Sequence, residues 1–178
     1  MPKFPTVGKL EAARRHLETA ALLHFNAGDP VPIHTLVAAA YGVLEGVAAK
    51  TGRKMFIAQS LEAGFSPKLV DVLKSAMRRP QNYFKHANRS NDPENVEYSP
   101  TFTQLMLLDA YSMLLQLTGE RPILLAAFQA WCFVHLHELR EVLPELKRAP
   151  QSERKRLEQL EPQAFLSECL QNILGLQS

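Results

Sequence analysis

The chain of 178 residues lacks the short motifs by which many enzymes are identified. It contains no glycine-rich phosphate loop, no zinc-ligand spacing of cysteine and histidine, and no G-x-S-x-G turn around a nucleophilic serine. The sequence Glu-x-x-His, which di-iron bundles carry on two helices, is also absent. These absences argue against P-loop hydrolases, α/β-hydrolases and di-iron or zinc enzymes, and we expect no metal and no other cofactor.

Cysteines and long apolar runs are scarce. The two cysteines, Cys132 and Cys169, lie far apart in apolar helical sequence, and we expect free buried thiols in a reducing compartment. The first residues carry scattered charges and no apolar stretch typical of a secretion signal. The longest apolar run, Ile123 to Val134, is shorter than the ~20 residues needed to cross a bilayer. The sequence therefore predicts a cytoplasmic protein without a membrane partner.

Alternating strand patterns are absent, whereas apolar residues recur at helical spacing along the whole chain. Two dipeptides, Ser66-Pro67 and Ser99-Pro100, have the composition of a helix start, with a capping side chain before a first-turn proline. Together these patterns predict helices over 7–26, from about Ile33 to near Gly52, from Pro67, from Pro100 to before Gly119, from Pro122 to before Pro144, near Ser152–Leu160, and after Pro162.

The predicted helices define the fold class and the domain organisation. We expect an all-α helical bundle of six to seven helices, because no strand is available to form a sheet. Residues 1–149 form the predicted bundle domain, and residues 150–178 form a C-terminal helical appendage packed on or beside it.

Positive charge is concentrated in one part of the chain, although the net charge is only +2. Nine Lys or Arg residues and two acidic residues lie between Lys50 and Arg89, which leaves the rest of the chain negative. A basic region of this kind is typical of contact with nucleic acid or nucleotide, and equally of a solvated surface. The candidate nucleic-acid contacts are Lys74, Arg78, Lys85 and Arg89.

The densest part of this region is RRPQNYFKHANR, from Arg78 to Arg89. Arg79, Asn82, His86 and Arg89 are spaced by three, four and three residues, so they share one face if the helix continues. Pro80 predicts either a kink or the start of a new helical segment. The stripe is thus either a solvated helix surface or a surface that binds phosphate.

These residue types suit cleavage of an RNA phosphodiester. The 2′-hydroxyl of RNA is itself a nucleophile, so the protein needs only a proton-transfer group and a fixed cation. Histidine titrates near neutral pH and suits the first role for His86. The planar guanidinium of Arg79 suits stabilisation of charge on the phosphate, and Asn82 could orient His86 or bind a phosphate oxygen.

An arginine followed after six residues by a histidine, within a small all-α bundle, resembles the HEPN superfamily over roughly residues 9–119. Many members are metal-independent ribonucleases and toxins, and some lack activity. The resemblance implies a homodimer with one composite site made by two facing motifs, and often a partner antitoxin. The resemblance implies that Arg79 and His86 are the catalytic residues. Pro80 stands at the position where the family usually has a polar residue.

A second hypothesis comes from a different class: a non-catalytic helical module that binds a protein partner or a nucleotide through the basic face. Other polar residues have simpler expectations. His16 and His34 are expected at the surface, and His24 in the core or an interface. Asp109 could be a buried partner of the candidate site, but it shares a face with Ser112 and Gln116, which predicts solvent exposure.

Overall fold

A computed structural model describes residues 6–57, 59, 66–85, 94–136 and 151–175. Seven helices and no strand are present in these residues: α1 (Lys9–Phe25), α2 (Pro30–Lys50), α4 (Pro67–Lys85), α5 (Pro100–Thr118), α6 (Ile123–His135), α8 (Gln151–Glu158) and α9 (Pro162–Leu174). The predicted all-α helical bundle is confirmed.

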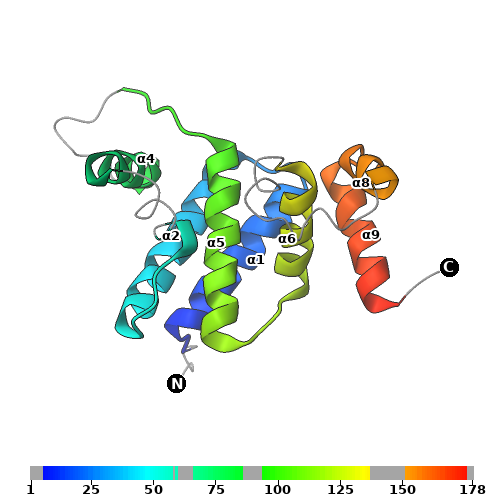
Figure 1. Cartoon of the computed structure of the whole chain (residues 1–178), viewed down its shortest axis with the longest axis horizontal. Helices are drawn as coiled ribbons and strands as arrows, with labels where there is room; N and C mark the ends of the chain where they lie inside the picture. Colours follow the sequence, from blue (N-terminus) through cyan, green and yellow to red (C-terminus); the bar gives the residue numbers. More distant parts are fainter. Residues whose placement is uncertain (1–5, 58, 60–65, 86–93, 137–150, 176–178) are drawn as a thin grey trace, which may run out of the picture.

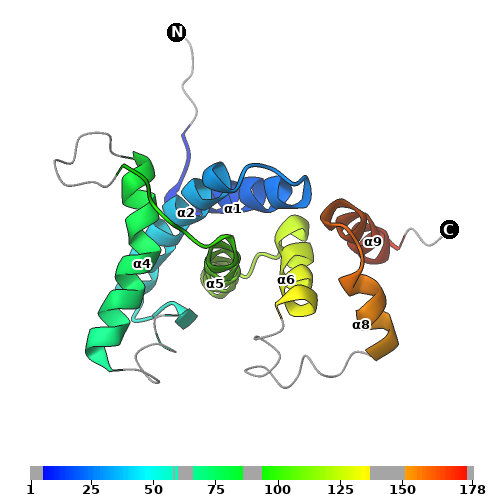
Figure 2. The same cartoon turned by 90° about the horizontal axis from the view of Figure 1, so that it is seen from above.

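Four helices form the centre of the bundle. Figure 1 shows α1, α2, α5 and α6 side by side, with α4 on the flank of α2 and with α8 and α9 on the flank of α6. Viewed from above, α5 is seen almost end-on between α2 and α6 (Figure 2). The largest fully buried side chains include Phe25, Tyr111 and Phe128, which come from three different central helices.

The helix boundaries follow the capping residues of the sequence. The Ser99 side chain accepts a hydrogen bond from the Phe102 amide at the start of α5, and Asp29 does the same for Val31 at the start of α2. Gly119 ends α5 with φ of 73°, a left-handed conformation that glycine adopts without a steric penalty. The Ser99 cap explains the predicted start at Pro100, and the predicted start at Pro67 is confirmed as well.

Helix α4 packs mainly on α2 and continues through Pro80. Of the two alternatives for Pro80, the start of a new helical segment is therefore wrong, and the kink stays a prediction. Pro80 is buried, as is Met77 one turn before it, so the two residues belong to the face that contacts the bundle. Arg78 and Arg79 lie between them in sequence and are exposed.

The C-terminal helices share the core of the bundle. Phe165 of α9 is 1% exposed, and its ring stacks on Phe25 and meets Trp131 edge to face. Helix α6 ends at His135, well short of the predicted end before Pro144, because Leu136 leaves the helical conformation with φ of −89° and ψ of 89°. The predicted domain boundary at residues 149–150 lies outside the described residues.

Helix α2, with 21 residues, is long and apolar enough by composition to cross a membrane. The central helix of a soluble bundle passes the same test, and α2 packs against α1, α4 and α5. The cytoplasmic location and the lack of a membrane partner stay predictions.

Candidate functional site

The predicted basic stripe lies on the C-terminal half of α4. Arg79 is exposed and Asn82 is half-buried, one turn further along the helix. Arg79 makes no ion pair with another described residue. Lys85, the last residue of α4, is exposed. His86, Arg89 and the side chain of Lys74 lie outside the described part of the chain, so the structure does not place the proposed Arg79–His86 pair.

Arg78, a predicted nucleic-acid contact, has a partner within the protein. Its Nη2 donates to both carboxylate oxygens of Glu45 on α2, at 2.9 and 3.0 Å. The two side chains are 58% and 40% exposed, so this is a surface ion pair that links α4 to α2. A phosphate that binds Arg78 has to compete with the Glu45 carboxylate.

The end of α4 is held by an aromatic cluster around His34. The His34 ring meets Phe84 and Tyr98 with ring centroids 5.8 and 5.6 Å apart, and its Nδ1 lies 2.8 Å from Thr103 Oγ1. His34 is 3% exposed, so the expectation of a surface histidine is wrong. The error arose because Phe84, Tyr98 and Thr103 come from segments remote from α2 in sequence.

Asp109 is 3% exposed, and the expectation that it faces solvent is also wrong. Its carboxylate accepts hydrogen bonds from Tyr41 Oη at 2.9 Å, Phe56 N at 2.8 Å and Ile57 N at 3.0 Å. Burial raises the pKa of the Asp109 carboxyl, and the three hydrogen bonds oppose that rise. Asp109 therefore fastens the segment after α2 to α5 and is a structural residue.

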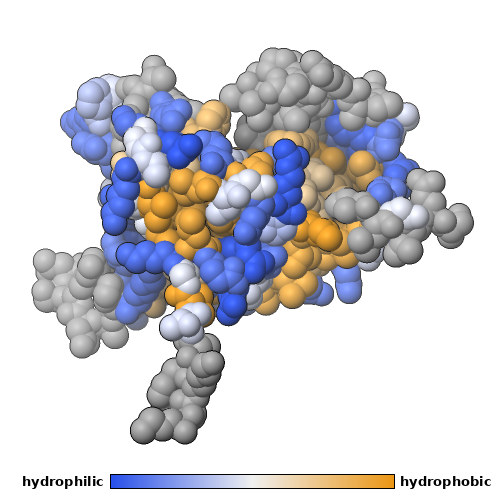
Figure 3. All heavy atoms as spheres, turned by 90° about the horizontal axis from the view of Figure 1, so that it is seen from below, coloured by the Kyte–Doolittle hydropathy of each residue, from blue (hydrophilic) through white to orange (hydrophobic). Residues whose placement is uncertain are grey.

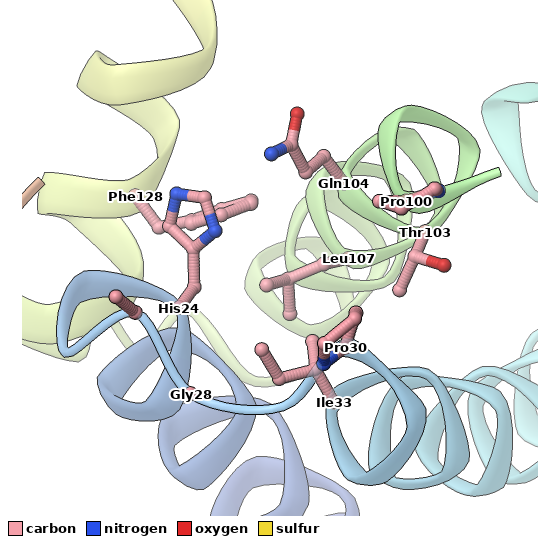
Figure 4. Close-up of a pocket in the computed structure, with 10 residues that line it drawn as sticks. His24, Gly28, Pro30, Ile33, Pro100, Thr103, Gln104, Leu107 and Phe128 are labelled. Atoms are coloured by element: carbon pink, nitrogen blue, oxygen red, sulfur yellow. The ribbon is translucent and has the colours of Figure 1, made fainter.

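A pocket of about 240 Å³ opens where the α1–α2 connection meets the start of α5 and the middle of α6. Its wall is largely apolar and includes Ile33, Leu107 and Phe128 (Figure 4). The polar side chains that border it are Gln104 and His24, because the Thr103 hydroxyl is engaged by His34 and by the Ser99 carbonyl. The pocket was not predictable from the sequence, because four separate segments contribute to it.

His24 packs among aromatic rings at one side of this pocket. Its ring centroid lies 5.2 Å from that of Phe128 and 5.4 Å from that of Trp131. Burial, together with the charge of nearby His135, lowers the pKa of His24 to about 4. His24 is therefore neutral at pH 7, and its half-buried ring lies at the edge of the core beside the pocket.

Within the described residues, no group of three or more His, Cys, Asp or Glu side chains is arranged to hold a metal ion. Cys132 is a buried free thiol, and Cys169 is a half-buried one. Comparison of the chain with protein-family models, with curated proteins and with solved structures gave no match.

Proposed function

We propose that this is an HEPN-like, RNA-directed protein and a metal-independent endoribonuclease of toxin or defence type. One observation carries the proposal: Arg79 and Asn82 lie one turn apart on α4, and the exposed Arg79 has no ion-pair partner among the described residues. A guanidinium that is free of internal carboxylates can bind a phosphate without first losing a protein contact.

In the proposed reaction the 2′-hydroxyl of the substrate attacks the adjacent phosphorus, and the 5′-oxygen of the next nucleotide leaves. His86 accepts the proton of the 2′-hydroxyl and delivers a proton to the leaving 5′-oxygen, so the proton lost at one oxygen is gained at the other. Arg79 stabilises the negative charge that develops on the phosphate oxygens, and Asn82 orients His86 or binds one of those oxygens. The products are a 2′,3′-cyclic phosphate and a free 5′-hydroxyl. The phosphate carries one negative charge before and after the reaction, and the proposed step uses no metal.

The proposal includes a homodimer in which two α4 motifs contribute to one composite site. Large apolar side chains that stay exposed in one chain support self-association. Among the described residues these are Val7, Leu22, Val31, Phe56 and Ile123. Figure 3 shows apolar residues gathered at the centre of one face with polar residues around them. Sedimentation should give a dimer at tens of micromolar, and a monomer at that concentration contradicts the composite site.

The test is cleavage of single-stranded RNA in EDTA, with DNA of the same sequence as the control, because DNA lacks the nucleophile. His86→Ala should lower the rate by about 10²–10⁴-fold and leave RNA binding nearly unchanged. Arg79→Ala should cost about 3–4 kcal/mol of transition-state stabilisation. The neighbouring Arg78→Ala is the matched control. It should weaken binding only slightly and leave the maximal rate unchanged, because Arg78 is already paired with Glu45.

The second candidate is a non-catalytic module that binds a protein partner or a nucleotide. The Arg78–Glu45 ion pair favours it, because Arg78, a candidate nucleic-acid contact next to the stripe, is already neutralised by the protein and so contributes less to binding of an RNA backbone. Equal behaviour of wild type and His86→Ala on RNA, combined with loss of partner binding in Arg79→Ala, would establish the module and exclude the ribonuclease.

A further inference from the structure

The pocket at the α1–α2 connection carries polar groups that the fold leaves available. The Gln104 carboxamide offers one donor and one acceptor, and it makes no hydrogen bond with another described residue. Figure 4 shows it extending from α5 toward the side of the pocket where His24 and Phe128 lie, and one ring nitrogen of His24 faces the same space. The two polar groups therefore face one small volume.

The charge of the pocket restricts the ligand. Among the residues that the structure describes, no Lys, Arg, Asp or Glu lines it, and His24 is uncharged at neutral pH. A phosphate or carboxylate group would lose its hydration here without gaining a cation, and an ammonium group would gain no carboxylate. The part of a ligand that enters the pocket is therefore uncharged.

The size and shape of the pocket restrict the ligand further. A volume of about 240 Å³ is below the range of about 300–1,000 Å³ typical of drug-sized ligands, so it suits one ring system. Pro30 and Ile33 provide apolar walls that a ligand can reach. Leu107 and Phe128 lie behind them and are 1% and 0% exposed, so neither offers a free face to a ligand. A flat uncharged ring is stabilised here by burial of its apolar faces against the two accessible side chains.

We infer that this pocket binds an uncharged nucleobase, whose donor–acceptor edge pairs with the Gln104 carboxamide while its ring packs against the accessible side chains of Pro30 and Ile33. A glutamine side chain can form two hydrogen bonds with an adenine edge, which presents an amine donor beside a ring-nitrogen acceptor. The base comes either from a free nucleoside or from an unpaired position of single-stranded RNA. The inference does not depend on cleavage by Arg79 and His86.

The experiment is a titration of the full chain with adenosine and, separately, with a short single-stranded oligoadenylate. Trp131 is the single tryptophan of the chain, and its ring lies next to that of His24, so its fluorescence reports on the pocket. Both titrations are repeated with Gln104→Met, which keeps the length of the side chain and removes its hydrogen bonds. Gln163→Met on the exposed start of α9 is the matched control.

A saturable fluorescence change with adenosine, weakened about tenfold or more by Gln104→Met and unchanged by Gln163→Met, supports the site with a free nucleoside as ligand. The same pattern with oligoadenylate alone supports it with an RNA base as ligand. Purine riboside, which lacks the amine donor, should bind more weakly than adenosine. No saturable change with either probe, or equal binding by wild type and Gln104→Met, overturns the inference.

The result of the adenosine and oligoadenylate titrations can be distinguished from the result of the RNA-cleavage test. His86→Ala should keep the Gln104-dependent binding even if it loses RNA cleavage. Gln104-dependent binding by a wild-type protein that leaves RNA intact would sustain the nucleobase site and remove the ribonuclease.

Discussion

Helices α4 and α5 are both 19 residues long, and both begin at a proline that follows a serine. Their polar residues nevertheless have opposite environments. Helix α5 lies inside the bundle, with nine buried residues that include Asp109. Helix α4 packs mainly on α2 and exposes Arg78, Arg79 and Lys85. The neighbours of a helix thus decide which polar groups become structural and which remain available to a ligand.

The largest effect that follows from this comparison concerns Asp109. Asp109→Ala leaves the Tyr41 hydroxyl and the amides of Phe56 and Ile57 without their acceptor in a buried place. We expect the free energy of unfolding to fall by about 3–5 kcal/mol, measured by urea titration. Tyr41→Phe removes one donor of three and should cost about 1 kcal/mol. A loss below about 1 kcal/mol for Asp109→Ala would contradict its structural role.

The next effect is a dependence of stability on pH that originates in the interior. The native pKa of His24 is about 4, against 6.5 for an ordinary histidine, so the unfolded chain binds more protons between these values. Stability should therefore fall as the pH drops from 6.5 toward 4, by roughly 2–3 kcal/mol from this group. His24→Phe should match wild type near pH 7.5 and lose less stability at pH 4.5. Parallel pH profiles of the two proteins would refute this origin.

On the exposed side of α4 the expected effects are small. Removing either member of the Arg78–Glu45 pair should cost about 0–1 kcal/mol, because both side chains are largely solvated. A double-mutant cycle at low and high salt measures the coupling, which should shrink as salt rises. A coupling well above 1 kcal/mol that is insensitive to salt would mean that this surface resembles the interior around Asp109.

The smallest expected effect is that of Arg79→Ala on stability. Arg79 is exposed and makes no ion pair with a described residue. The free energy of unfolding of Arg79→Ala, measured by thermal unfolding, should therefore stay within about 0.5 kcal/mol of the wild-type value. A larger loss would show that Arg79 supports the fold, and any defect of this variant on RNA would then lose its functional meaning.

Several features of the fold were predictable because their causes lie within a few residues. The Ser99 cap, the proline after it and the left-handed Gly119 define α5 without help from the rest of the chain. The helical spacing of apolar residues likewise predicted that α1 has a buried side, which includes Leu17 and Ala20. The position of Arg79 and Asn82 on one face of α4 follows from helical spacing alone.

The environments of Asp109 and His34 were not predictable in this way. Helix α5 is apolar on most of its circumference, so its periodicity does not define a solvent side. The donors that satisfy Asp109 lie more than fifty residues earlier in the chain, and Thr103, which pairs with His34, lies 69 residues after it. A single acidic residue in the middle of the apolar segment LMLLDAYSMLL was a signal that Asp109 could be a buried hydrogen-bond acceptor. That signal was not sufficient, because a buried acceptor needs donors and the sequence does not show which segments supply them.

The sequence by itself determined that the chain forms helices, where several of them begin and end, and that its positive charge gathers around α4. These properties follow from backbone sterics, capping hydrogen bonds and composition, all of which act over short distances. Only the tertiary structure decided that Asp109 and His34 are buried, that Arg78 is paired with Glu45, and that Gln104 and His24 share a pocket. Each of these depends on contacts between helices, and contacts of that range are chosen by packing of the whole core.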